Sequence, residues 1–299
     1  MQLGRSVKFI QSCRVNAYLH LRELIRNVKT NRAINPFAEA LLSRLVLLTP
    51  ETAIVGGARM YLAKDRISLQ MALSKTWEPR NSALVQEHVR RGDTVVDVGA
   101  HIGYFTLLFS RLVGKDGRVY AFEPNPGNYQ LLKMNIEANE CRNVIIEQKA
   151  VSDRTGTSRL KYGMICGANA GSDSCISDDS LPVETVSLDE YFGDEKVQIS
   201  FLKMDIEGHE LSALRGAART IERSESMKIL TEFDPFRWLK VGVNPKEFLE
   251  LLARVGFEVS IIDSTRAELQ LVTNHDLMVR RYNQMGKNLD LFCVRASKR

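Results

Sequence analysis

The 299-residue sequence has no run of about 18 apolar residues, so a membrane-spanning helix is not expected. Its longest apolar stretch, LLSRLVLLTP, is short and contains Arg44. The start of the chain lacks the apolar core and small-residue cleavage site of a secretory signal peptide. The five cysteines are dispersed without a CxxC pair, which fits reduced thiols better than a disulfide framework. We therefore expect a cytoplasmic protein.

Internal repeats are also absent, and the net charge of +5 is unevenly distributed. Residues 1–33 contain seven Lys and Arg against Glu23 alone. Within this basic arm, Leu21, Leu24, Ile25 and Val28 have the spacing of an amphipathic helix. The helix would pack on its own domain or on a second subunit in a homodimer, or it would make peripheral contact with an anionic membrane. A nucleic-acid partner is not expected, because the arm has little aromatic interleaving.

What the sequence does contain is an alternation of strand and helix patterns. Residues 1–78 predict a basic helical extension, with helices broken near Pro36 and short strands or a hairpin around Lys64-Asp65. Residues 79–299 predict a mostly parallel, doubly wound sheet covered on both faces. Its expected strands are 94–98, 118–122, 144–151, 200–204, 228–233 and 257–262, and its expected helices are 81–90, 104–113, 126–139, 211–222 and 245–255.

One hydrophilic excursion interrupts this alternation. Extra strands are expected at 156–162 and 182–188, on either side of a segment, 163–180, that is rich in Gly, Ser and Asp. A long loop inside a compact domain is usually functional or disordered. The segment is therefore either a substrate lid or a plain surface loop.

The stretch TVVDVGAHIGYFTLLFS, residues 94–110, places an acid and two glycines where a strand passes into a helix. Ligands of open α/β sheets bind at the carboxyl ends of the strands. A Cβ at Gly99 or Gly103 would obstruct a ligand or force a strained φ, and the helix that follows offers unpaired N–H groups. A carboxylate at Asp97 suits an ammonium group, directly or through water, and repels a diphosphate.

The next two strands extend this binding edge. Glu123, in YAFEPNP, lies at the end of the second strand, where a carboxylate can accept hydrogen bonds from both hydroxyls of a ribose. The third strand ends at Ala150-Val151-Ser152-Asp153, where an adenine would lie against Val151 and close to Ser152. An adenosine that carries an amino acid is S-adenosylmethionine. The alternative, NAD, fits less well because the G-x-G-x-x-G pattern lacks a glycine and gains an acid.

Together these motifs resemble the FkbM family of S-adenosylmethionine-dependent methyltransferases over about 67–295. The segments that carry the resemblance are DTVVDVGAHIGYFTLL, YAFEPNP, AVSD, LPVETVSLDEYF, KMDIEGHELSALRGA and LTEFDPF. The resemblance implies an α/β fold with a class I (Rossmann-like) methyltransferase sheet and O-methylation of sugars, polyketides or other natural products. The family commonly has Asn where this chain has His101. The expected cofactor contacts are Asp97, Gly99, Ala100, His101, Gly103, Glu123, Pro124, Val151, Ser152 and Asp205.

The acceptor side is expected at the ends of the fourth and fifth strands, where acids follow both. Methyl transfer to an alcohol needs an aligned acceptor and a group that removes its proton. The catalytic candidates are Asp205, Glu232 and His209. Glu210 could instead complement the N-terminus of a helix, and His209 could be an ordinary surface histidine. Asp205 and Glu232 on adjacent strands also suggest a Mg²⁺ site, although their spacing is not in itself a metal signature.

The sequence leaves the acceptor open among a saccharide, a lipid head group and a secondary metabolite. Two alternatives belong to other classes of protein. One is a non-catalytic scaffold that keeps the methyltransferase fold and recruits partners through residues 1–50. The other is an NAD-dependent oxidoreductase.

Overall fold

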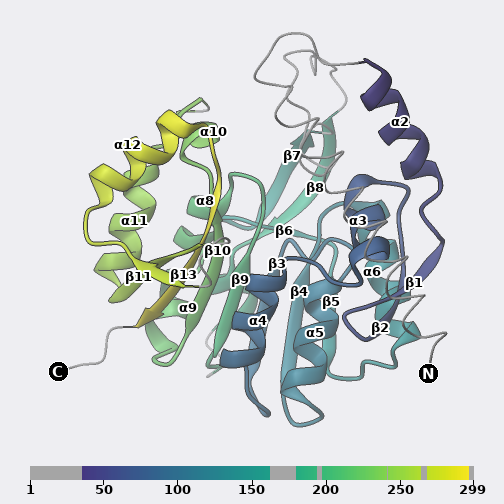
Figure 1. Cartoon of the computed structure of the whole chain (residues 1–299). Coiled ribbons are helices and arrows are strands. Elements are labelled where there is room, and N and C mark those ends of the chain that lie inside the picture. Colours follow the sequence, from purple (N-terminus) through teal and green to yellow (C-terminus); the bar gives the residue numbers. More distant parts are fainter. Residues whose placement is uncertain (1–35, 162–179, 194–196, 241, 264–267, 296–299) are drawn as a thin grey trace. The chain divides into compact units, whose positions relative to one another are not determined.

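The computed structural model describes the chain except residues 1–35, 162–179, 194–196, 241, 264–267 and 296–299 (Figure 1). The basic arm and the expected lid, apart from Ser180, lie outside the described residues. The described chain divides into two units, one ending at Glu78 and the other beginning at Pro79. Among the described helices, none has the length and apolar character needed to cross a membrane.

The first unit contains a β-hairpin between two helices. It comprises α2 (Pro36–Leu47), β1 (Thr52–Val55), β2 (Ala58–Tyr61) and α3 (Arg66–Ser74). The hairpin turns at Gly56-Gly57, so the prediction of a turn at Lys64-Asp65 was wrong. Both glycines have positive φ, which a tight two-residue hairpin turn requires. Asp65 instead caps α3, and its carboxylate accepts the N–H of Ser68 at 2.6 Å.

The second unit is built on an eight-stranded sheet with the order β12-β11-β13-β10-β9-β3-β4-β5. The strands are β3 (Thr94–Val98), β4 (Arg118–Phe122), β5 (Val144–Glu147), β9 (Phe201–Met204), β10 (Lys228–Phe233), β11 (Phe257–Ile262), β12 (Leu269–Leu271) and β13 (Leu289–Arg295). Strands β5, β4, β3, β9 and β10 are parallel, and β13 runs antiparallel between β10 and β11. The strand order reverses between β3 and β9, which confirms the predicted doubly wound sheet.

Helices cover both faces of this sheet (Figure 1). They are α4 (Pro79–His88), α5 (Tyr104–Val113), α6 (Pro126–Ala138), α7 (Leu188–Phe192), α8 (Glu210–Arg215), α9 (Ala218–Arg223), α10 (Pro235–Lys240), α11 (Pro245–Arg254) and α12 (His275–Met285). On one face, Phe109 of α5 packs against Phe201, and His88 of α4 stacks on Phe292 at 4.7 Å. On the other, Leu211 and Phe248 belong to a buried cluster with residues of the central strands. This double coverage explains the nearly continuous apolar strands.

Two predicted elements are interrupted in the structure. The strand expected over 144–151 ends at Glu147, because its partner β4 ends at Phe122 and offers no further pairing. Ala150 and Val151 form β6 in a separate three-stranded sheet with β8 (Ser180–Val186) and β7 (Gly156–Lys161). The helix expected over 211–222 is divided into α8 and α9. A Cβ at Gly216 would lie 2.0 Å from the carbonyl oxygen of Ser152, so the backbone passes too closely there for any other residue.

Two further parts of the second unit differ from the prediction. The strand expected over 182–188 ends at Val186, because Ser187 caps α7 and accepts the N–H of Glu190 at 3.2 Å. Three elements that the sequence did not predict, β12, α12 and β13, follow β11. Strand β13 then enters the sheet between β11 and β10, so the last part of the chain completes the core.

Candidate active site

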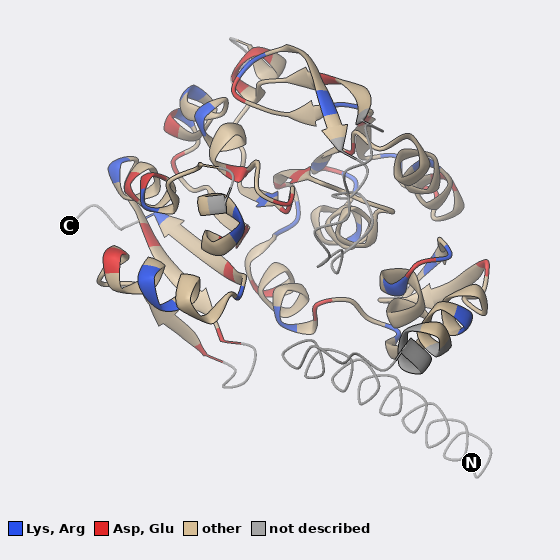
Figure 2. Ribbon diagram, turned by 90° about the horizontal axis from the view of Figure 1, so that it is seen from above, with Lys and Arg blue, Asp and Glu red and all other residues tan. Residues whose placement is uncertain are grey.

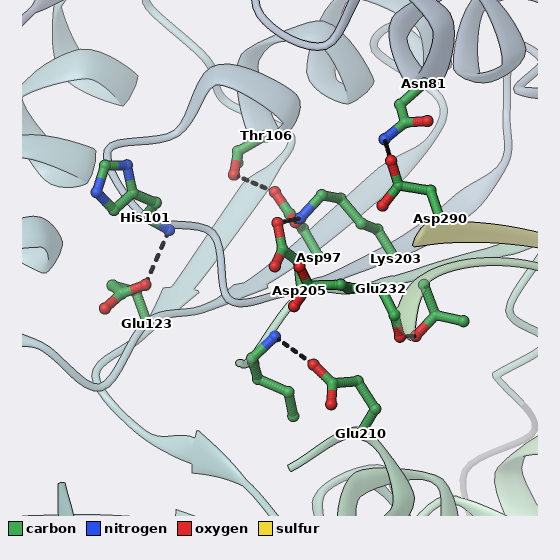
Figure 3. A network of polar contacts seen from close by, with 12 residues as sticks. Asn81, Asp97, His101, Thr106, Glu123, Lys203, Asp205, Glu210, Glu232 and Asp290 are labelled. Atoms are coloured by element: carbon green, nitrogen blue, oxygen red, sulfur yellow. Dashed lines mark hydrogen bonds and ion pairs between the residues drawn. The ribbon is translucent and has the colours of Figure 1, made fainter. Parts of the chain in front are cut away.

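The candidate site lies at the carboxyl ends of β3, β4, β9 and β10, where the strand order reverses (Figure 3). Figure 2 views this edge from above and shows acidic segments beside basic ones. The structure brings Asp97, Asp205 and Glu232 into one polar network, with Glu123 on the neighbouring strand (Figure 3). The sequence predicted all four acids at the ends of strands.

Asp97 is fully enclosed by protein. Its side chain is 0% exposed, and one carboxylate oxygen accepts the hydroxyl of Thr106 at 2.6 Å. The other oxygen lies 3.8 Å from the ammonium of Lys203, its direct neighbour across β3 and β9. Burial raises the pKa of Asp97, and the charge of Lys203 opposes this. The protein ammonium beside Asp97 is that of Lys203, and the expected contact of Asp97 with the cofactor, directly or through water, stays a prediction.

The two glycines of the first loop are required by the backbone, through a positive φ at both and a close approach of another segment at Gly99. Gly99 has φ +79°, and a Cβ there would lie 2.1 Å from the carbonyl oxygen of Asp205. Gly103 has φ +94°, and its Cβ would meet the side chain of Leu132 at 2.6 Å. The sequence correctly required glycine, and the predicted approach of a ligand to this loop stays a prediction. Ala100, between them, is buried and donates its N–H to the carbonyl of Phe122 at 3.0 Å.

Glu123 is fixed at the end of β4 by backbone groups. Its carboxylate accepts the N–H of His101 at 2.8 Å and, beyond Pro124 in its own loop, that of Asn125 at 3.0 Å. His101 has φ +52°, a left-handed conformation that this hydrogen bond helps to hold. Burial raises the pKa of Glu123. A carboxylate has about four acceptor sites, so it retains capacity for a ligand hydroxyl.

Of the predicted adenine contacts, Val151 lies on β6 and Ser152 directly follows it, so neither is at the end of the third strand of the main sheet. Val151 is buried in the core cluster that also contains Phe122 and Val186. Ser152 donates its N–H to the carbonyl of Val186 at 2.9 Å, and its hydroxyl lies 3.2 Å from that of Ser212. Their role toward a cofactor stays a prediction. The end of β5 is occupied by Glu147, whose carboxylate accepts the hydroxyl of Tyr191 at 3.0 Å.

Lys203 is the central residue that sequence reasoning missed. Its side chain is only 5% exposed, and its ammonium lies 3.6 Å from Asp205 as well as 3.8 Å from Asp97. The ring of Phe105 lies 5.1 Å from the same nitrogen, in a cation–π contact. A lysine is rarely buried unless it is paired. Its position in the apolar strand FLKM, two residues before Asp205, was the available signal.

Three carboxylates meet on the acceptor side of this lysine. Asp205, Glu207 and Glu232 each offer one oxygen, and these oxygens lie within 4.8 Å of one another. Glu207 forms an ion pair with Arg237, and one oxygen of Glu232 accepts a hydrogen bond from Asn288. The second oxygen of Glu232, Oε2, is buried without a hydrogen-bond partner in the described part of the chain. Burial and the neighbouring negative charges, Asp205 first, raise the pKa of Glu232.

The C-terminal strand adds a fourth acid that the sequence did not suggest. Asp290 of β13 lies directly opposite Glu232 of β10, so the two side chains share a face of the sheet. The Asp290 carboxylate accepts the side-chain amide of Asn81, from α4, at 3.0 Å. Burial raises the pKa of Asp290 to about 6. Neither β13 nor its register could be recognised from the local pattern.

The two remaining candidates behave differently from each other. Glu210 is 1% exposed, and its carboxylate accepts the N–H groups of Ile206 at 2.9 Å and Gly208 at 3.0 Å. It therefore closes the loop between β9 and α8, which is a more specific task than complementing a helix end. Burial raises the pKa of Glu210 to about 7. His209 precedes α8 with an exposed side chain that makes no capping hydrogen bond, and its catalytic role stays a prediction.

Comparison with known proteins identifies methyltransferases as relatives. The chain is 27% identical to hexuronic acid methyltransferase AglP from Haloferax volcanii over 186 residues, which cover 62% of this chain and 72% of AglP. It is 39% identical to the 31-O-demethyl-FK506 methyltransferase FkbM from Streptomyces tacrolimicus over 74 residues, which cover 25% of this chain and 28% of that protein.

A solved structure and a family model complete the comparison. The precorrin-6y C5,15-methyltransferase from Geobacter metallireducens aligns with 79% of this chain and 95% of its own, at 12% identity and a TM-score of 0.44, which is too low to carry a conclusion. The model of the methyltransferase FkbM domain matches residues 97–259, more than half of the chain. This match covers the cofactor loops and the acidic strand ends described above. The chain therefore belongs to the FkbM family of S-adenosylmethionine-dependent methyltransferases.

Proposed function

We propose that the protein transfers a methyl group from S-adenosylmethionine to a hydroxyl group of a saccharide, a lipid head group or another hydroxylated natural product. The observation that carries the proposal is the pair of carboxylates, Asp205 and Glu232, at adjacent strand ends beside the cofactor loops. The relatives support it, since AglP is a methyltransferase for a hexuronic acid and FkbM for 31-O-demethyl-FK506.

The cofactor would be held along the ends of β3 and β4. When bound, S-adenosylmethionine supplies a methyl group that is already activated for transfer. Glu123 would accept a hydrogen bond from a ribose hydroxyl, with the acceptor site that its three protein donors leave. The loop from Gly99 to Gly103, with Ala100 and His101, would surround the methionine part. Val151 and Ser152 would lie on the adenine side, and Pro124 would follow the ribose contact.

Asp205 is the first candidate to accept the proton of the acceptor hydroxyl. Its side chain is 35% exposed, so a ligand can reach it, while Lys203 holds one of its oxygens at 3.6 Å. Glu232 is the second candidate, because its buried Oε2 has no hydrogen-bond partner among the described residues. His209, exposed two residues before Leu211, is the third. A base in hydrogen-bonding reach of the hydroxyl contributes a factor of about 10²–10⁴ to such a reaction.

Cations of the protein already pair with two of the three carboxylates that could hold a divalent metal. Asp205, Glu207 and Glu232 have the oxygen ligands that Mg²⁺ prefers. However, Lys203 already pairs with Asp205, and Arg237 already pairs with Glu207. These three carboxylates therefore fit the cations of the protein better than a bound Mg²⁺. Methyl transfer should accordingly persist in excess EDTA.

The proposal is tested with S-adenosylmethionine that carries a tritiated methyl group. The full chain is incubated with it and with a panel of methyl glycosides, glycolipids and cell extract, and methylated products are identified by mass spectrometry. We expect transfer to a hydroxyl, reduced at least about 100-fold in Asp205→Asn. Asp276→Asn, an exposed change on α12, is the matched control.

Other outcomes would support the alternatives. Tight cofactor binding without a product from any acceptor would favour a non-catalytic scaffold. Fluorescence changes on binding of NADH, without S-adenosylmethionine binding, would favour an oxidoreductase.

The basic arm supports a further expectation about location. We propose that residues 1–33 contact anionic lipid or a second copy of the chain, because their charge and apolar spacing suit either surface. Flotation with anionic vesicles and light scattering, each with and without residues 1–33, separate the two. Unchanged behaviour in both measurements would contradict the proposal.

A further inference from the structure

Acids outnumber bases where the acceptor would bind. Three strands contribute to this acceptor edge, which we define by the carboxylates of Asp205, Glu207, Glu232, Asp234 and Asp290 and by the cations Lys203 and Arg237. The edge lies in the same site that we propose for methyl transfer, so any selectivity that it confers on the reaction rests on the proposed function.

Both cations of the acceptor edge are already engaged by its acids. The ammonium of Lys203 lies between Asp97 and Asp205, at 3.8 and 3.6 Å. The guanidinium of Arg237 pairs with Glu207 and lies 3.5 Å from Asp234. An anionic group on the acceptor would have to compete with these acids for a cation.

Glu232 adds a requirement for a hydrogen-bonding partner. Asn288 donates to one of its oxygens, but Oε2 is buried without a partner in the described chain. An ionised Glu232 only accepts hydrogen bonds at Oε2, whereas a protonated Glu232, which its raised pKa favours, can donate one. A hydroxyl both donates and accepts, so it satisfies Oε2 in either form of Glu232, whereas a carboxylate, sulfate or fully ionised phosphate satisfies only the protonated form. Leaving such a buried acceptor unpaired costs binding free energy.

We propose that this acceptor edge selects neutral or cationic hydroxyl compounds and discriminates against anionic ones. Like charges within a few ångströms repel strongly at a partly buried site, and salt screens that repulsion. We expect neutral and amino-substituted acceptors to exceed the matching acid at least about tenfold in kcat/KM. A factor of ten corresponds to about 1.4 kcal/mol.

The test uses sets of sugars that differ in charge at one position. Methyl glucoside, galactoside and mannoside are each compared with the corresponding uronic acid and 6-amino-6-deoxy sugar, using the full chain, tritiated S-adenosylmethionine and EDTA. Low and high salt are compared, because the discrimination should shrink as salt screens the site. A uronic acid that is methylated as well as, or better than, its neutral partner would overturn the inference.

A binding measurement keeps this test independent of turnover. Saturation-transfer NMR with the protein loaded with S-adenosylhomocysteine ranks the binding of the same sugars even if no methyl group moves. Absence of transfer to every sugar would count against the proposed function for saccharides. Absence of binding, or stronger binding of the acids, would count against the charge selection.

A Glu232→Gln variant tests whether Glu232 is responsible for the charge selection. The amide cannot ionise and can always donate to a carboxylate, so the neutral-to-acid ratio of kcat/KM should fall at least about threefold. Glu225→Gln is the matched control, because it makes the same chemical change on an exposed residue before β10, at the opposite end of that strand. An unchanged ratio in a Glu232→Gln protein with normal thermal melting would contradict the assignment.

Discussion

At the scale of single residues, the buried ammonium of Lys203 compensates the negative charge of the acids beside it. Lys203 is matched by Asp97 and Asp205, and Asp97 has no exposure to water. Removing one member of a buried ion pair typically costs about 3–5 kcal/mol, because the other charge is left uncompensated. We expect Lys203→Met to lose a free energy of unfolding of this order. In the double variant Asp97→Asn/Lys203→Met most of the loss should be recovered.

Urea denaturation of four proteins measures this coupling: the wild type, the two single variants and the double variant. Asp97→Asn alone is the necessary control, because it leaves Lys203 paired with Asp205. Equal stabilities of Lys203→Met and the double variant would show that the charge of Asp97 does not depend on Lys203.

Gly99 illustrates a second residue-scale constraint, one of space rather than charge. Gly99→Ala would place a Cβ 2.1 Å from a backbone oxygen of Asp205 at φ +79°. Gly92 has a similar φ, +85°, and nothing within 4 Å of an added Cβ. Gly92→Ala should therefore cost only the left-handed backbone penalty of about 1–2 kcal/mol. Gly99→Ala should lose at least about 2 kcal/mol more.

Thermal and urea denaturation of the two alanine variants give this difference directly. Similar losses at both positions would mean that the backbone of Asp205 moves aside easily. The loop after β9 would then be less tightly fixed than the structure indicates.

At the scale of elements, Glu210 links the loop after β9 to the start of α8. Its folded pKa of about 7 lies above the ordinary 4.5, so the folded protein binds this proton more tightly than the unfolded chain. The contribution to stability is fully present below about pH 4.5 and is lost as the pH rises through about 7. One pKa unit corresponds to about 1.36 kcal/mol, so the loss amounts to about 3 kcal/mol.

The measurement is the free energy of unfolding of the wild type and Glu210→Gln at pH 5 and pH 8. The stability difference, wild type minus variant, should be larger at pH 5, because the glutamine cannot titrate. Glu222→Gln on the exposed side of α9 controls for the general effect of losing a carboxylate. A wild-type advantage that is the same at both pH values would contradict the raised pKa.

The elements that the sequence predicted correctly are those whose hydrophobic pattern directly reflects burial on both faces of the sheet. Strands 94–98 and 118–122 match β3 and β4 because they are central and uninterrupted. The division of 211–222 was not predictable, since it depends on Gly216 meeting Ser152 from a distant segment. Lys203 was missed for a similar reason. Its partner Asp97 lies far earlier in the chain, and only the strand register places them together.

At the scale of the whole molecule, the family match is shorter than the folding unit. It ends at residue 259, within β11, whereas the sheet is completed by β13. Strand β13 pairs with β10 over Lys228–Phe233 and with β11 over Phe257–Ile261, so it is what joins β11 and β12 to the other strands. It also supplies Asp290 to the acceptor edge. Sequence patterns missed this strand because its partners are set by the tertiary fold.

Truncation tests this dependence. A chain of residues 79–299 contains the whole eight-stranded sheet and should unfold cooperatively and bind S-adenosylmethionine. A chain of residues 79–262 retains the family match but leaves one edge of β10 unpaired and β11 detached from it. An exposed edge of this kind favours aggregation, and the buried side chains of Leu291 and Phe292 are lost with β13.

Circular dichroism melting and calorimetric titration with the cofactor compare the two chains. A cooperative transition and normal binding in residues 79–262 would show that β11 can join the sheet without β13, whereas failure of residues 79–299 alone to fold would show that the first unit is needed as well.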